Sequence, residues 1–220
     1  MTSQPLTTSW REPIPAPYEG RPADVIFSSL QPKGSLVPRG RALFWEGDAQ
    51  VHKIEVVDGV IRAVRLLDDG NRQILTFFWP GDVVLPAHAA CQQFTAEAVT
   101  NCRVRFSPVA NVCDTGGTCG ARQVLAETLS LVTTMGQRNS TARIAHFLLG
   151  IRRHLPADPV SPGALRLLIS RADIADHIGT SIETVCRMLA DLKVRGLVDL
   201  PTRKTILFRD LVGLRRVAGH

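Results

Sequence analysis

The chain has 220 residues, 45% of them apolar, 21% charged and 5% aromatic, and its formal net charge is +6. This composition is typical of a globular protein with one or two apolar cores, and it excludes a disordered or fibrous chain. No stretch approaches the roughly 20 uninterrupted apolar residues of a membrane helix, and the first residues lack a basic-then-apolar signal segment, so we expect a cytoplasmic protein with no membrane partner.

The first half of the chain is predicted to be a short arm followed by an antiparallel β domain. Five prolines fall within residues 1–22, which we interpret as an N-terminal arm. From residue 23 to 118, short alternating runs are separated by turns rich in Gly, Asp and Pro, which favours a small barrel or sandwich. The expected strands are 43–45, 54–57, 60–67, 73–79 and a last β-rich run, 94–106.

Residues 119–150 are predicted to form one amphipathic helix, about 30 residues long and bent near Gly136, because apolar residues recur at spacings of three and four. A helix this long in a small protein usually packs against a partner helix. We expect that partner to be the same helix of a second copy, with packing against the chain's own β domain as the alternative. The dimerisation residues would be Val124, Leu125, Leu129, Val132 and Met135.

Residues 151–220 carry the pattern of a winged helix-turn-helix, which makes the expected fold class α+β. A capping box at Ser170 opens one short helix that stops at Gly179, and a second cap at Thr180 or Ser181 opens the next. The second helix would bury Val185, Met188, Leu189 and Leu192 and end at Gly196. Two strands, 196–200 and 205–208, then form a wing around a basic turn.

The positive charge is concentrated in this last part. Residues 151–220 contain 12 basic and 7 acidic residues, a net charge of +5, whereas residues 1–150 have a net charge of +1. A small basic domain joined to a nearly neutral one is typical of nucleic-acid binding, because neutralising phosphates supplies affinity for any sequence. A basic surface that merely faces solvent is the alternative.

The outward face of the second helix is the candidate reading surface for double-stranded DNA. Arg pairs with guanine O6 and N7, Glu accepts from a base amino group, and an apolar side chain can touch a thymine methyl. The alternative is a solvated Glu–Arg pair at i and i+4. The expected base-reading residues are Ile182, Glu183, Cys186 and Arg187. The expected contacts to the DNA backbone are Ser170, Arg171, Thr180, Ser181, Thr184, Arg203 and Lys204.

Residues 169–189, ISRADIADHIGTSIETVCRML, resemble the DNA-binding helices of the Crp/Fnr superfamily of bacterial transcription regulators, nearest to its Fnr and FixK branches. The runs LFWEGD (43–48), 59–67 and FWPGD (78–82) resemble the family's β-roll, a cyclic-nucleotide-binding-like sensor domain, and RIAHFLL (143–149) resembles the end of its dimerisation helix.

This resemblance implies a homodimer on a two-fold symmetric site that activates transcription by touching RNA polymerase. Glu183 and Arg187 match the family's base-reading residues. Ile182 stands where the Fnr branch is apolar, which favours a TTGAT-like half-site. Cys186 departs from the usual Ser or Gly, and it could make DNA binding sensitive to oxidation or be inert.

The effector is left open by the sequence. Members that bind cyclic nucleotide hold its phosphate with an Arg that residues 81–97 lack, so we expect no cAMP binding. Iron–sulfur members use three cysteines near the N-terminus, and none is present there. An iron–sulfur cluster or metal, a thiol redox switch, or no role at all remain open for Cys91, Cys102, Cys113 and Cys119, and haem remains open through His52 or His88.

An enzyme is the alternative hypothesis from a different functional class. The β domain lacks the clustered His and Glu ligands of a metal-dependent barrel enzyme, and no nucleophile elbow, phosphate loop or paired-carboxylate signature occurs elsewhere. We therefore expect a regulator. The remaining alternatives are a regulator without a ligand that is controlled by its abundance, and a β-barrel enzyme or carrier.

Overall fold

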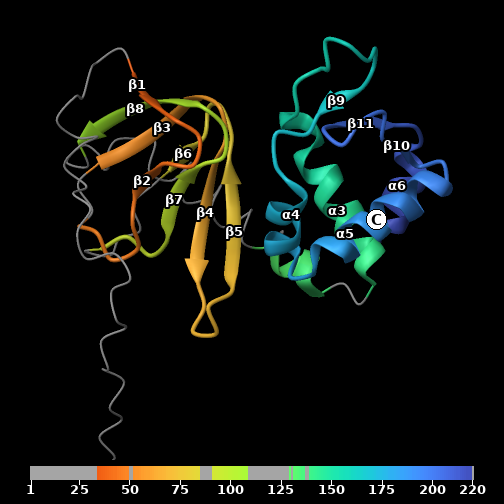
Figure 1. Cartoon of the computed structure of the whole chain (residues 1–220), viewed down its shortest axis with the longest axis horizontal. Coiled ribbons are helices and arrows are strands. Elements are labelled where there is room, and N and C mark those ends of the chain that lie inside the picture. The colour runs from red at the N-terminus through yellow and green to blue at the C-terminus, as the bar shows by residue number, and fades with distance from the viewer. Residues whose placement is uncertain are drawn as a thin grey trace, which may run out of the picture.

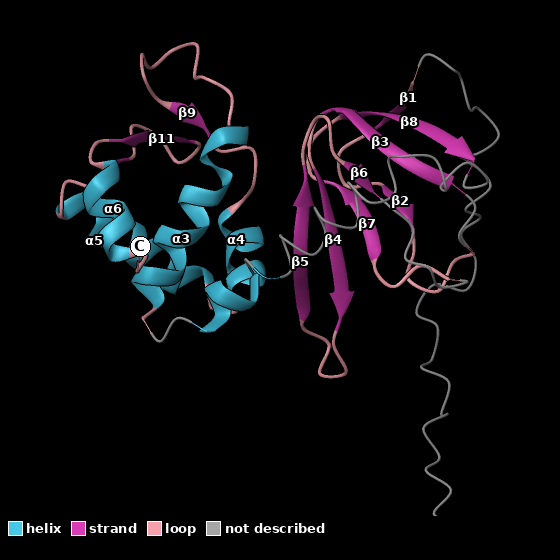
Figure 2. Ribbon diagram, turned by 180° about the vertical axis from the view of Figure 1, so that it is seen from behind, coloured by secondary structure: helices cyan, strands magenta, loops and turns pink. Residues whose placement is uncertain are grey.

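The computed structural model describes residues 34–49, 52–84, 91–108, 129, 131–136 and 139–219, so the expected N-terminal arm, 1–22, lies outside the described part. An N-terminal β domain and a C-terminal helical domain lie side by side (Figure 1). They meet where strand β5 (Arg72–Phe78) faces helix α4 (Arg171–Ile178), and the reverse view shows the same arrangement (Figure 2).

Two antiparallel sheets, with strand orders β1-β8-β3-β6 and β2-β7-β4-β5, build the β domain. Side chains from both sheets, among them Ile54, Val56 and Ile61, are buried together in one apolar cluster, as expected for strands with one face toward a core. The other strands are β1 (Ser35–Val37), β2 (Ala42–Phe44), β3 (His52–Asp58), β4 (Ile61–Leu66), β6 (Val83–Val84), β7 (Thr95–Ala98) and β8 (Cys102–Pro108).

The sequence Trp-X-Gly-Asp occurs at 45–48 and 79–82 and forms the same turn twice. In each turn the Asp carboxylate accepts the Trp backbone N–H at 2.8 Å. Gly47 and Gly81 have φ values of 91° and 93°, which a residue with a side chain rarely adopts. The second turn follows β5 and holds Trp79 at the domain boundary, where its ring stacks on His154 with centroids 5.0 Å apart.

The expected β-rich run 94–106 contains two strands, β7 and β8. Residues 99–101 leave the sheet and wrap around the turn between β3 and β4. There the Val60 backbone N–H donates to Thr100 Oγ1 at 3.0 Å, and the Val99 N–H donates to the Val60 carbonyl at 2.8 Å.

The apolar core of the helical domain includes Ile144, Leu148, Ile174, Leu189 and Leu214, and it continues across the boundary to Ile74, Phe77 and Trp79 of the β domain. Its elements are α3 (Ser140–Ile151), the 3₁₀ turn η2 (Arg152–His154), β9 (Leu165–Arg166), α4, α5 (Ile182–Val194), β10 (Val198–Asp199), β11 (Thr205–Phe208) and α6 (Leu211–Val217). Of the helices described here, none combines the length and apolar content required to span a bilayer.

The single helix expected for 119–150 is interrupted, so that prediction is wrong at Asn139. Residues 131–136 are helical, but Asn139 has extended backbone angles (φ −97°, ψ 123°), and its side chain accepts the Thr141 N–H at 2.9 Å. Asn is a favoured N-cap residue, so α3 begins anew at Ser140. It packs on α4, α5 and α6 inside the helical domain.

The wing has three strands where two were expected. β9 pairs with β11, which in turn pairs with β10, and Thr205 lies opposite Arg166 in this sheet. β9 has only two residues, which is too short to produce an alternating pattern in the sequence.

Candidate nucleic-acid interface

The helix-turn-helix is fixed by local capping interactions. Ser170 and Asp173 form a complete capping box at the start of α4, with the Asp173 N–H donating to Ser170 Oγ at 3.0 Å. Gly179 ends α4 in the left-handed conformation (φ 68°), and Ser181 then caps α5 by accepting the Thr184 N–H at 3.2 Å. These signals confirm the expected capping box and the glycine turn, and they assign the second cap to Ser181.

One face of α5 is anchored in the core. Val185, Leu189 and Leu192 are each at most 1% exposed, and Met188 is partly buried, where its sulfur accepts a hydrogen bond from the Thr141 hydroxyl at 3.0 Å. Three fully buried side chains at spacings of three and four prevent the helix from rotating about its axis. The opposite face of α5 is therefore held in a fixed direction.

The four expected base-reading residues all lie on that opposite face. Ile182 is 46% exposed, and Glu183, Cys186 and Arg187 are also exposed. The Glu183 carboxylate accepts hydrogen bonds from its own backbone N–H and from the Ser181 side chain, which lowers its pKa. An ionised Glu183 can accept hydrogen bonds from base amino groups at neutral pH, and Arg187 supplies donors one turn further along.

Arg171, the first residue of α4, borders this face. Burial lowers the pKa of its guanidinium, which also interacts electrostatically with Cys186. Among the described residues, Arg171 Nη1 has no hydrogen-bond partner, and no Asp or Glu forms a salt bridge with the Arg171 side chain. A buried guanidinium nitrogen with unused donors can hold an anionic oxygen such as that of a phosphate.

The hydroxyl residues expected at the DNA backbone differ in what they can donate. Ser170 gives its one hydroxyl proton to Asp173 at 2.6 Å, and the one proton of Ser181 is used within the cap, by the Glu183 carboxylate or by Thr184 Oγ1 at 3.1 Å. Both hydroxyls thus serve the helix caps. Thr180 and Thr184 are half-buried.

The tip of the wing presents three cations. Arg203 and Lys204 are exposed in the turn that joins β10 to β11, as the sequence predicts for residues that meet phosphate. Sequence analysis missed Arg166, which is exposed on β9 opposite Thr205, next to this turn. Only the strand pairing brings Arg166 there, so no local sequence signal could have identified it.

The expected dimerisation residues form an exposed apolar row as far as they are described. Leu129 is 57% exposed, Val132 62% and Met135 38%. Val124 and Leu125 lie outside the described residues. On the opposite side of the same segment Thr134 is buried, and its hydroxyl is 2.8 Å from His146 Nδ1 of α3.

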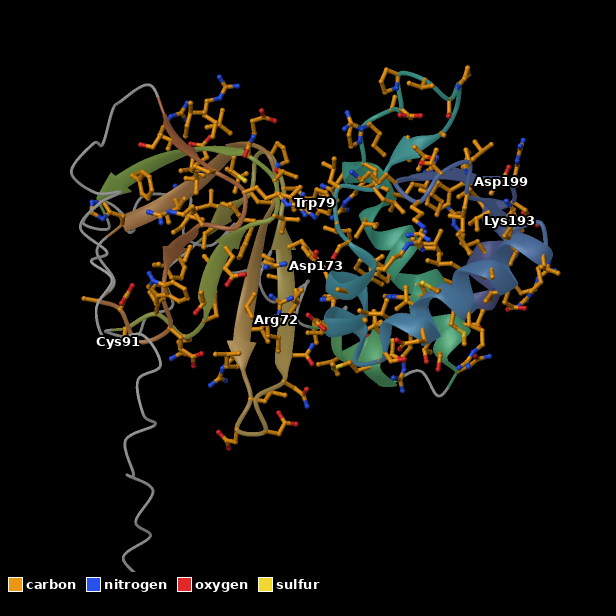
Figure 3. All side chains as sticks on the ribbon, viewed as in Figure 1. Arg72, Trp79, Cys91, Asp173, Lys193 and Asp199 are labelled. Atoms are coloured by element: carbon orange, nitrogen blue, oxygen red, sulfur yellow. The ribbon has the colours of Figure 1, made fainter. Side chains whose placement is uncertain are left out.

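The structure describes two of the four sensor-domain cysteines. Cys91 is exposed on the side of the β domain away from the helices (Figure 3). Cys102 is buried and donates to the Val60 carbonyl at 3.2 Å, and burial raises its pKa, so the thiol stays protonated. Cys113, Cys119 and His88 lie outside the described residues.

His52 is the one haem-candidate histidine that lies within the described residues. His52 is described on β3, where its ring meets Phe106 edge-on at 6.1 Å. Among the described side chains no group of three or more His, Cys, Asp and Glu residues is arranged to hold a metal ion.

Known proteins are similar to this chain in both sequence and fold. A family model described as a Crp-like helix-turn-helix domain matches residues 142–217. The nitrogen fixation regulation protein FixK of Azorhizobium caulinodans is 31% identical over 93% of this chain and 86% of its own length. The fumarate and nitrate reduction regulatory protein of Escherichia coli K12 is 23% identical over 84% of this chain and 78% of its own.

A solved structure extends the likeness to three dimensions. FixK2 from Bradyrhizobium japonicum matches with a TM-score of 0.74 and 27% identity, covering 84% of this chain and 96% of FixK2. The expected fold class, an antiparallel β-roll followed by helices and a winged helix-turn-helix, is confirmed. The chain belongs to the Crp/Fnr superfamily of transcription regulators, near its Fnr and FixK branch, and it is not an enzyme.

Proposed function

We propose that two copies of the protein bind a palindromic DNA site with TTGAT-like half-sites, each copy placing α5 in the major groove. The observation that carries this proposal is the exposed face of Glu183 and Arg187, held in place by the buried Val185, Leu189 and Leu192 on the other side of α5. Ile182 extends that face with an apolar side chain that suits a thymine methyl.

The wing and the start of α4 supply the affinity that does not depend on sequence. Arg203, Lys204 and Arg166 gather at the wing, and Arg171 adds a guanidinium beside the reading face. Cations on both flanks of a recognition helix suit the two phosphate backbones that border a major groove. This arrangement supports DNA as the partner over a merely solvated basic surface.

The test is an equilibrium binding measurement with a palindromic TTGAT duplex and a scrambled duplex of the same length. Arg187→Ala should reduce the preference for the palindrome by about tenfold or more, because a bidentate Arg–guanine contact is worth about 1–3 kcal/mol per half-site. Arg195→Ala is the matched control, since Arg195 is exposed at the other end of α5 and pairs with Asp191.

A parent protein that binds both duplexes equally would contradict base reading, and so would an Arg187→Ala variant that keeps the parent's preference. Loss of preference in the Arg195→Ala control would show that the effect is not specific to the reading face.

Transcription activation through RNA polymerase is the function that we carry over from the family. FixK and the fumarate and nitrate reduction protein are named as regulators. Transcription in vitro from a promoter with an upstream palindrome should rise when the protein is added. A fall in transcript would identify a repressor.

A redox response is a second candidate function, and the position of Cys186 favours it. The thiol is exposed on the reading face, one position before Arg187 and three after Glu183, so any group added to sulfur would stand between the protein and the base edges. We assign the response to this thiol because it lies on the reading face, whereas Cys102 is buried and protonated and the exposed Cys91 lies on the far side of the β domain. A regulator controlled by abundance alone would bind DNA equally before and after oxidation.

A further inference from the structure

Segments far apart in the chain meet at the domain boundary. β5 is the outer strand of the sheet β2-β7-β4-β5, and α4, the first helix of the helix-turn-helix, packs against it. Arg72 of β5 and Asp173 of α4 both lie at this junction, with Trp79 further along it (Figure 3). We call Arg62, Arg72, Asp173 and Asp176 the interdomain clamp.

The first half of the clamp is largely buried. Arg62 of β4 binds Glu97 of the neighbouring strand through Nε and Nη2 at 2.9 and 2.6 Å, and its Nη1 donates to Asp173. The side chain of Asp173 is 5% exposed and that of Arg62 16%. Burial opposes the charge on Arg62, but its bonds with Glu97 and the charge of Asp173 outweigh this and raise its pKa. The Arg62 guanidinium therefore stays charged at every physiological pH.

The second half lies nearer the surface. Arg72 Nη2 donates to Asp176 Oδ2 at 2.7 Å and lies 3.7 Å from Asp173 Oδ1. Asp173 and Asp176 are three residues apart and so occupy one face of α4. Side chains of Arg72 and Asp176 are 34% and 28% exposed, so this pair can be altered without leaving a charge in a dry core.

Neutral contacts on the same helix face complete the junction. Gln73 Nε2 donates to the His177 carbonyl at 3.2 Å, and the His177 ring lies 3.1 Å from the Ile74 carbonyl through Nδ1. Because a carbonyl only accepts, Nδ1 carries the proton. The ring also packs on Phe77 and Phe147, with centroids 5.4 and 5.1 Å away.

The clamp holds the helix next to the recognition helix without covering the reading face. Glu183 and Arg187 remain exposed while the clamp is formed. On the covalent path between the domains, Asn139 has extended backbone between two helical segments, which fixes no angle by itself. The ion pairs at α4 and the apolar packing across the boundary thus determine how each recognition helix is oriented relative to its own β domain.

We propose that the clamp residues are positioning residues that set the distance and angle between the two recognition helices of the dimer, and hence the spacing between half-sites that the protein accepts. This inference rests on the proposed function. One added base pair moves a half-site by about 3.4 Å and turns it by about 35° around the DNA axis. With the clamp intact, the helical domain cannot shift to reach the displaced half-site. With the clamp broken, the helical domain can move relative to the β domain and bind that half-site.

The experiment measures binding of full-length protein to TTGAT palindromes whose spacers differ by single base pairs, and to a duplex with one half-site. Arg72→Asp sets like charges against Asp176. Arg72→Asp with Asp176→Arg restores the pair in reverse. Arg105→Asp is the matched control, because Arg105 forms a similar 2.7 Å pair with Glu55 on the other sheet. Small-angle scattering of the same four proteins without DNA reports domain docking.

The parent should prefer one spacer. Arg72→Asp should weaken that preference about fivefold or more, the scale of a typical coupling between sites, while binding to the single half-site is unchanged. The reversed pair should recover the preference, and Arg105→Asp should retain it. Scattering should show a larger radius of gyration for Arg72→Asp alone.

A merely structural role would lower binding to all duplexes together, and this result would overturn the proposal. An unchanged spacer preference in Arg72→Asp would overturn it as well. Should the parent fail to distinguish the palindromes from scrambled DNA, the proposed function fails, and scattering alone decides on the clamp: identical profiles for the parent and Arg72→Asp would overturn it.

Discussion

The side chains of the candidate DNA interface are concentrated in the first turn and a half of α5. Glu183, Cys186 and Arg187 share one exposed face there, and the Glu183 carboxylate is kept ionised by hydrogen bonds from its own N–H and from Ser181. These positions could be predicted from the sequence because helix caps and apolar spacing are local signals. The partner of Asp173, by contrast, is Arg62, 111 residues away, and no local pattern points to it.

Alkylation of Cys186 should block DNA binding. A maleimide adduct on this exposed thiol would displace at least one base contact worth about 1–3 kcal/mol, so affinity for the palindrome should fall about tenfold or more. Cys186→Ser should bind normally and resist the reagent. Cys91→Ser is the control, since Cys91 is also exposed but lies on the far side of the β domain. If Cys91→Ser rather than Cys186→Ser keeps DNA binding after maleimide treatment, the sensitive thiol is Cys91 of the β domain.

Helix α4 packs against the β domain, and His177 makes the stability of this contact sensitive to pH. Burial lowers the pKa of His177 to about 4 from 6.5, although its bond to the Ile74 carbonyl opposes the shift. Between pH 6.5 and about pH 4, His177 is protonated in the unfolded chain but not in the folded chain. The free energy of unfolding therefore decreases as the pH falls through this range.

The free energy of unfolding should fall by about 2 kcal/mol between pH 7 and pH 5 through this residue. Denaturant titrations at pH 7 and pH 5 measure this loss in the parent. In His177→Gln the loss of unfolding free energy should be smaller by this amount. His154→Gln is a useful comparison, because burial and the charge of Arg153 also lower the pKa of His154. Equal pH dependence in the parent and His177→Gln would contradict the account. The charged groups on the same helix, Asp173 and Asp176, face Arg72.

The helices and strands that the sequence predicts are those with a regular apolar spacing or a helix cap. Both helices of the helix-turn-helix and most strands of the β domain were expected near their observed bounds. β9 was missed because two residues carry no period, and 94–106 was expected as one run because β-type residues continue through the turn at 99–101. The helix is broken at Asn139, three residues after the bend that is expected near Gly136.

The whole molecule is proposed to be a dimer. The exposed apolar row of Leu129, Val132 and Met135 is its expected interface, so a substitution there tests the dimer. Val132→Asp should dissociate it to a monomer of 24.0 kDa in sedimentation equilibrium, because a carboxylate would be buried against the partner helix without a counter-charge. Val132 is 62% exposed in one chain, so the variant should fold. Val194→Asp, at a residue 87% exposed on α5, should stay dimeric. A parent that is already monomeric at micromolar concentration would contradict the dimer.

The central claim is that Arg187 of each copy reads a guanine in its half-site. The most direct measurement is a double-mutant cycle between Arg187→Ala and replacement of that guanine by 7-deazaguanine, which removes N7 and little else. The account predicts that the parent loses affinity for the altered DNA, whereas Arg187→Ala binds both duplexes equally, with a coupling of about 1–3 kcal/mol per half-site. Losses that simply add, with no coupling, would contradict it.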